Sequence, residues 1–191
     1  MSTQELFDKA QERYRYARRL VTDMIDFVKK EQPNFNSKNS YFQVDVIVQF
    51  ILLKVALADG KFLEIEGEFI DQITDGYDIT SLFDSQEENY NWSFAGAFLT
   101  FEQVGKIVSV VENRAWEHIL AFSDLFAEVD LIDSSKNYVR ELYECIKDVA
   151  SYFIMADGNA TKHEIETAVN VVRECLTDPW LAKQRKLKNK K

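Results

Sequence analysis

Two short acidic segments hold the residues of this chain that are best suited to chemistry. Asp59 and Glu66 belong to the first segment, and Asp157 and Glu164 belong to the second. In both segments a Gly follows the Asp directly, and the Glu comes seven residues after the Asp. The two segments are 98 residues apart. Carboxylate oxygens suit hard divalent cations such as Mg²⁺ and Ca²⁺. The pattern therefore predicts a repeated acidic turn that could bind a divalent cation.

The spacing within each turn limits which carboxylates can share one ion. Residues two apart on a helix point about 200° apart, so Glu66 and Glu68 cannot act together. Asp59 with Glu66, and Asp157 with Glu164, are the better pairs. Because two carboxylates make a thin site, tight binding needs both turns to converge, and the spacing is not that of the 12-residue EF-hand loop.

The same residues also have an ordinary structural interpretation. Thr161 and Glu164 have the spacing of a capping box, in which each side chain bonds the other residue's amide. Leu63 stands where Thr161 does and cannot accept such a bond, so capping explains Glu66 less well. An Asp before a Gly commonly bonds turn amides.

Other chemically active residues are few and scattered. We expect His163 to lie on the surface and His118 to be packed or half-exposed. Cys145 and Cys175 lack C-x-x-C spacing and are interpreted as buried, reduced thiols of a cytosolic protein. The sequence shows no Ser-His-Asp set, no phosphate-binding glycine loop and no nucleophile motif, so we assign no catalytic residue.

The elements that position the acidic turns are predicted to be helices. The 191 residues are 46% apolar and include only 6 Gly and 2 Pro, which favours long helices over a fold with many turns. Apolar periodicity and capping residues predict helices over 3–30, 41–58, 64–74, 101–129, 135–156 and 162–176, the last ending before Asp178-Pro179.

The apolar stripes repeat at the same 98-residue offset as the acidic turns. We therefore predict a single all-α domain over 1–182, an internally duplicated bundle of about six main helices. Its halves are 1–76 and 100–178, joined by the connector 77–99. Each half should bury its own stripes, and the core should contain Ile51, Val55, Val149 and Phe153.

Charge is distributed unevenly along the chain. The net charge is −9, yet the segment 183–191 contains six Lys or Arg and no acid. The acidic body is unsuited to nucleic acid, whereas the tail could make weak contact with nucleic acid or an anionic membrane. We expect this tail to be disordered. No apolar leader or membrane-spanning run is evident, and a cytoplasmic location is expected.

The segments Ala58-Asp59-Gly60 with Glu66, and Ala156-Asp157-Gly158 with Glu164, resemble the TerB-like (tellurite-resistance type) family. In that family an apolar helix runs into an Asp-Gly turn, and a Glu stands early in the next helix. The resemblance covers 41–74 and 135–176, and Leu63 departs from the small polar residue usual at its position. It implies an all-helical fold, a divalent ion held by Asp59, Glu66, Asp157 and Glu164, and a role in stress-response assemblies without established enzyme activity.

Two functions of different classes follow from the sequence. The first is a non-enzymatic bacterial stress-response module that binds another protein and a divalent cation. The alternative is a carboxylate-metal enzyme such as a hydrolase, which requires four carboxylates around one cleft.

Overall fold

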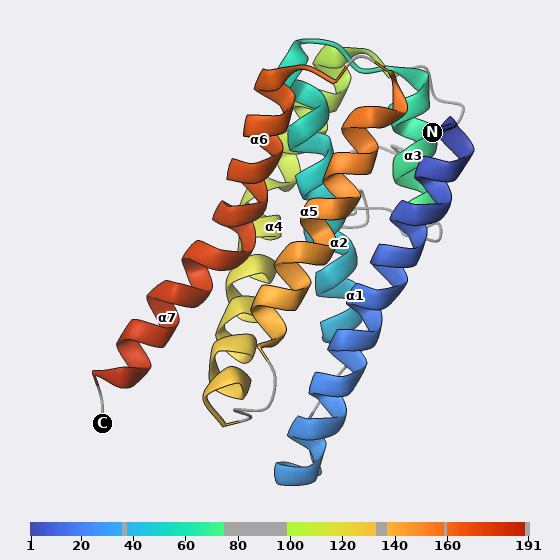
Figure 1. Cartoon of the computed structure of the whole chain (residues 1–191). Coiled ribbons are helices and arrows are strands. Elements are labelled where there is room, and N and C mark those ends of the chain that lie inside the picture. Colours follow the sequence, from blue (N-terminus) through green and yellow to red (C-terminus); the bar gives the residue numbers. More distant parts are fainter. Residues whose placement is uncertain (36–37, 75–98, 133–136, 159, 190–191) are drawn as a thin grey trace.

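The computed structural model describes residues 1–35, 38–74, 99–132, 137–158 and 160–189. These residues form an all-α bundle without strands, as the sequence predicts (Figure 1). The helices are α1 (Thr3–Glu31), α2 (Lys38–Ala56), α3 (Glu64–Ile73), α4 (Phe101–Ile132), α5 (Tyr138–Ala156), α6 (Lys162–Val172) and α7 (Asp178–Lys188). A 3₁₀ turn η1 (Leu57–Asp59) follows α2, and a π-helical turn η3 (Arg173–Thr177) joins α6 to α7.

Two pairs of helices, α1 with α4 and α3 with α6, start at the predicted offset of 98 residues. Ser2 caps α1, because its hydroxyl accepts from the Glu5 amide at 3.2 Å while its own amide donates to the Glu5 carboxylate at 2.6 Å. Thr100 and Gln103 make the same pair of bonds before α4, at 3.3 and 2.8 Å. Since α3 and α6 also begin 98 residues apart, the backbone framework occurs twice.

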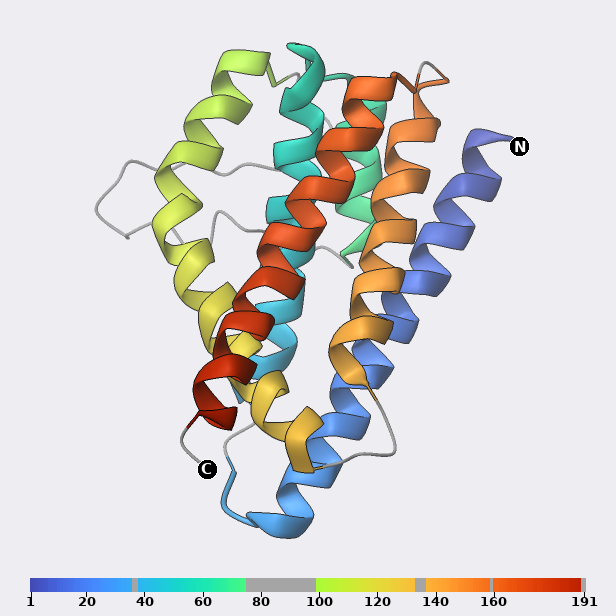
Figure 2. The same cartoon turned by 60° about the vertical axis from the view of Figure 1, so that its left-hand side comes forward.

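The packing, however, crosses between the halves. Helix α1 packs most extensively against α5, and α4 packs against α2 and, to a similar extent, against α7 (Figure 2). Polar contacts reinforce the first pair, because Arg13 bonds Asp148 and the Tyr16 hydroxyl donates to Glu141 at 2.9 Å. We expected each half to bury its own stripes. Instead, the first helix of each half covers the central helix of the other, so neither half is a separate packing unit.

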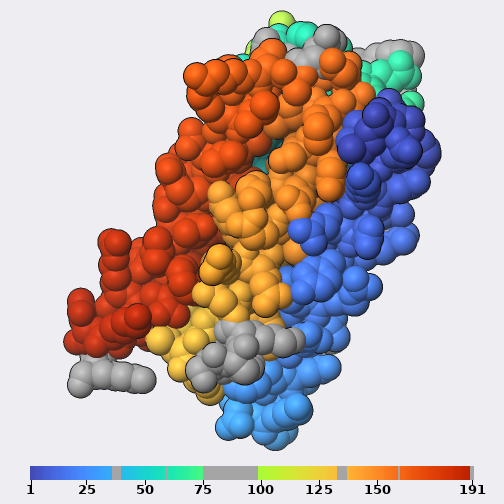
Figure 3. All heavy atoms as spheres, in the orientation of Figure 1, coloured from blue at the N-terminus to red at the C-terminus, as the bar shows by residue number. Residues whose placement is uncertain are grey.

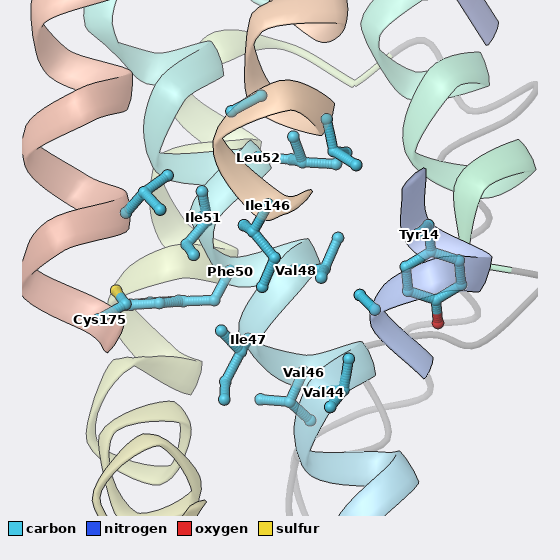
Figure 4. Packing of buried hydrophobic residues seen from close by; sticks show 14 of the residues in the cluster. Tyr14, Val44, Val46, Ile47, Val48, Phe50, Ile51, Leu52, Ile146 and Cys175 are labelled. Atoms are coloured by element: carbon cyan, nitrogen blue, oxygen red, sulfur yellow. The ribbon is translucent and has the colours of Figure 1, made fainter. Parts of the chain in front are cut away.

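Helix α2 is the centre of the bundle, since every residue from Val44 to Leu53 is buried (Figure 4). The predicted core residues Ile51, Val55, Val149 and Phe153 are all at most 2% exposed. The ring of Phe153 stacks edge-to-face on Phe69 of α3, with centroids 5.3 Å apart. The core prediction is therefore confirmed.

The end of the sixth predicted helix was wrong. The helix does not stop before Pro179 but continues through η3 into α7. The Asp178 amide bonds the Arg173 carbonyl five residues back, and this wider turn accommodates the proline within a continuous helix. When η1 is counted with α2, and α6, η3 and α7 are counted as one helix, the described residues form six helices, as predicted.

The prediction of a disordered tail was also wrong for 183–188, because these residues belong to α7, which lies against α4 (Figure 2). Lys183 pairs with Asp124 at 3.0 Å, and the buried Gln184 amide donates to the Ala127 carbonyl at 3.0 Å. The two last residues, and all of the connector 77–99 except Leu99, lie outside the described residues. None of the described helices combines the length and the apolar character that a bilayer crossing needs.

Candidate functional site

The structure brings both acidic turns to the same end of the bundle (Figure 1). Helices α2 and α5 run towards this end, and α3 and α6 run back from it. The turns are neighbours across the two halves, because η1 contacts α6 and α3 contacts α5. Both closing glycines have left-handed backbones, with φ of 82° at Gly60 and 79° at Gly158, as expected for residues that end a helix.

In the second turn, Glu164 forms the predicted capping box. The Thr161 amide donates to the Glu164 carboxylate at 2.7 Å, and the Glu164 amide donates to the Thr161 hydroxyl at 3.2 Å. Glu164 is only 6% exposed. Its carboxylate therefore already satisfies one of the amides that a helix start leaves unpaired. Asp157, at the end of α5, is half-buried.

The first turn makes half of this box. The Leu63 amide donates to the Glu66 carboxylate at 2.6 Å, and Glu66 is 8% exposed. Because Leu63 has no side-chain acceptor, the Glu66 amide turns back to the Leu63 carbonyl at 3.0 Å. The first turn therefore has one of the two hydrogen bonds of a capping box, through the Glu66 carboxylate, whereas Glu164 in the second turn takes part in both. The side chain of Asp59 lies outside what the structure describes.

The predicted cation site is made of pairs of carboxylates. The described residues contain no group of three or more His, Cys, Asp or Glu arranged to hold a metal ion. Any ion at Glu164 would share a carboxylate that already accepts the Thr161 amide. A divalent cation at Asp59 with Glu66, or at Asp157 with Glu164, stays a prediction.

A buried polar cluster between α1 and α2 was missed in the sequence. The Tyr14 hydroxyl donates to the carboxylate of Asp45, which is 5% exposed, and Arg18 lies 3.7 Å from the same carboxylate. Burial and the charge of Asp45 raise the pKa of Tyr14. Tyr14 shares a helical face with the apolar residues Ala10, Ala17 and Val21, so its position alone predicts only packing in the core. The signal was Asp45 with Gln49, two polar residues one helical turn apart in an otherwise apolar helix.

The histidines and cysteines lie as predicted. His163 is exposed, and His118 is half-buried with its ring against Phe42 at 5.0 Å between centroids. Desolvation lowers the pKa of His118. Both thiols are free and buried, and burial raises the pKa of Cys145 to about 11 and that of Cys175 to about 12. Neither supplies a thiolate nucleophile at neutral pH.

Fold and site together define a duplicated all-α bundle with two capped acidic turns at one end. No protein-family model matches the chain, and comparison with curated proteins and with solved structures finds no match. The resemblance to the TerB-like family therefore stays a prediction, based on the two Asp-Gly turns and the Glu that follows each.

Proposed function

We propose that this protein is a non-enzymatic interaction module of the tellurite-resistance type, acting in a bacterial stress response in the cytoplasm. The observation that supports the proposal is the position of both acidic turns at one end of the bundle. Buried Glu66 and Glu164 hold the shape of the turns, while Glu64 and Glu166 at the same helix starts are exposed. Glu166 makes only an exposed ion pair with Lys162, at 3.6 Å, so both carboxylates are open to a basic patch on a partner protein.

The interaction can be tested by reversing charge at that end. The double variant Glu64→Lys with Glu166→Lys should abolish capture of partner proteins from the native cell. The matched control, Glu12→Lys, reverses an exposed acid on α1 and should leave capture unchanged. Equal capture by all three proteins would contradict an acidic-end interface.

A divalent cation bound by Asp59 with Glu66, or by Asp157 with Glu164, is the second part of the proposal. Thermal unfolding should shift upward with Mg²⁺ or Ca²⁺ and return with a chelator, because an ion that binds only the folded state stabilises it. Glu164→Gln retains the cap but removes a charged ligand, so it should abolish this shift. If no cation stabilises the wild type, the turns are helix caps alone.

The alternative, a metal-dependent hydrolase, needs several carboxylates around one ion. Within the described residues no group of three potential ligands supports it. Turnover of any substrate that is lost in Asp157→Asn or Asp59→Asn would favour the enzyme over the interaction module.

A further inference from the structure

A groove of about 380 Å³ lies between the first half of α5, the π-helical turn η3 and α7. Its size is in the range of about 300–1,000 Å³ found for small-molecule sites. The elements that line it lie towards the end of the bundle opposite the acidic turns, on the side where α5 runs beside α6 and η3 (Figures 1 and 3). It therefore belongs to neither the acidic end nor its proposed partner.

Trp180, in the first turn of α7, lines the groove, and its indole Nε1 is buried with no partner among the described residues. An indole N–H is a donor only, and leaving such a group unsatisfied is unfavourable. Because this atom has almost no accessible surface, the Trp180 ring is a wall of the groove, and its N–H reports on how that ring is packed.

Positive charge predominates in the lining, although the whole chain carries −9. Arg140 and Arg173 line the groove together with a single acid, Glu144, which is paired with Lys147. Arg173 lies 3.6 Å from Asp178, and both side chains are 52% exposed, so this ion pair is weak. Arg140 is exposed and makes no ion pair with the described residues. The lining therefore favours an anion.

The rest of the lining is mainly apolar and aromatic. Val139 and Tyr143 of α5 lie across the groove from Trp180 of α7. The wide turn η3 sets the directions of Arg173 and Thr177, and π-helical turns are frequent at functional sites. An apolar wall with a few polar groups is the usual composition of a small-molecule pocket.

We infer that this groove binds a small organic carboxylate with an aromatic or acyl body. The body packs on the rings of Tyr143 and Trp180, and the carboxylate pairs with Arg140 and Arg173. Arg is the side chain best shaped to hold a carboxylate through two parallel bonds.

The experiment is a titration of the ¹⁵N-labelled full chain, read at the tryptophan indole N–H signals. The probes are 3-phenylpropanoate, octanoate and the neutral 3-phenylpropan-1-ol. At least one of the two carboxylates should shift the Trp180 signal saturably, with a Kd of about 1 mM or tighter. Which of the two binds more tightly shows whether the groove prefers an aromatic or an acyl body. The alcohol should bind at least tenfold more weakly. Trp180→Phe assigns the signal, and Trp116 of α4, which does not line the groove, serves as an internal reference.

Variants then test the recognition. Arg140→Gln should weaken carboxylate binding about tenfold and leave alcohol binding unchanged, since it removes only the charge pairing. Arg15→Gln, an exposed arginine on α1, is the matched control and should bind like the wild type. No saturable shift at Trp180 with either carboxylate, equal binding of the alcohol, or an unaffected Arg140→Gln would each overturn the proposal. The last two outcomes are read without Trp180→Phe, so the test does not depend on that variant folding.

Discussion

The two halves repeat one backbone but place it in different surroundings. Helix α2 is buried along the whole of 44–53, whereas α5 exposes Arg140, Glu144 and Met155. The difference arises after the acidic turns. In the first half α3 ends at Ile73, while in the second half the helix continues as α7 and packs on α4. The comparison shows that the two halves share helix starts and glycine turns, while the side chains between the helices differ.

The polar groups between the helices show this divergence most clearly. Tyr14 and Asp45 form a buried pair in the first half. The residues 98 positions later are Glu112 and Tyr143, and they form no such pair. Glu112 instead bonds Lys54 of α2 at 2.9 Å on a partly exposed surface. A buried cluster therefore joins α1 to α2, while a surface ion pair joins α4 to α2.

The largest effect is expected from the core. Phe153→Ala should lower the free energy of unfolding by about 3–5 kcal/mol, because it removes a ring that fills the space beside Phe69. Its repeat equivalent, Val55→Ala, removes less volume and should cost about 2 kcal/mol. Urea unfolding measures both values. Equal losses of stability would mean that the packing around α2 and that around α5 tolerate the loss of side-chain volume equally well.

Breaking the buried cluster should come next. Asp45→Ala leaves the Tyr14 hydroxyl and the Arg18 guanidinium without their carboxylate, and should cost about 2–4 kcal/mol. Tyr14→Phe should cost less, and the double variant should cost less than the sum of the two, by more than about 0.5 kcal/mol. Additive costs would mean that the two residues do not act as one cluster.

The sequence allowed the framework to be predicted more fully than the packing. Helix starts are local features, which is why the predicted starts at residues 3, 101 and 162 are confirmed. The position of α1 against α5 depends on contacts between distant segments, and no local pattern encodes it. The end of the sixth helix was predicted wrongly because a proline usually ends a helix. Here the preceding π turn allows the helix to continue through Pro179.

The candidate site was predictable only in part. The repeated Asp-Gly turns and the role of Glu164 as a cap were visible in the residue types. The shared end of the bundle was not, because it follows from how the halves interleave. The hydrogen bond between Tyr14 and Asp45 could not be predicted, because a tyrosine on a buried helix face is also explained by apolar packing alone. The Trp180 groove depends on the continuation of the sixth helix through η3 into α7, whereas the sequence predicted that this helix ends before Asp178-Pro179.

The closing glycines provide a direct measure of how similar the turns are. Gly60→Ala and Gly158→Ala should each cost about 1 kcal/mol, because an L-residue is strained at positive φ. An added Cβ meets no atom within 4 Å at either site, so the costs should agree within about 0.5 kcal/mol. Gly105→Ala, inside α4 and also in open space, is the control and should stabilise by about 0.5–1 kcal/mol. Unequal glycine costs would mean that the turns differ in backbone as well as in side chains.

The smallest effect separates the two partners of the capping box. Thr161→Ala removes the hydroxyl that accepts the Glu164 amide and should lower the free energy of unfolding by about 1 kcal/mol. Glu164→Gln should cost only a few tenths of a kcal/mol, because a glutamine oxygen can still accept from the Thr161 amide. The first turn has no hydroxyl to lose, so its half box depends on Glu66 alone. Glu66→Ala should therefore cost more than Glu66→Gln, in chemical unfolding without added cations. A cost for Glu164→Gln as large as that for Thr161→Ala would show that the negative charge, and not the hydrogen bond, holds the second turn.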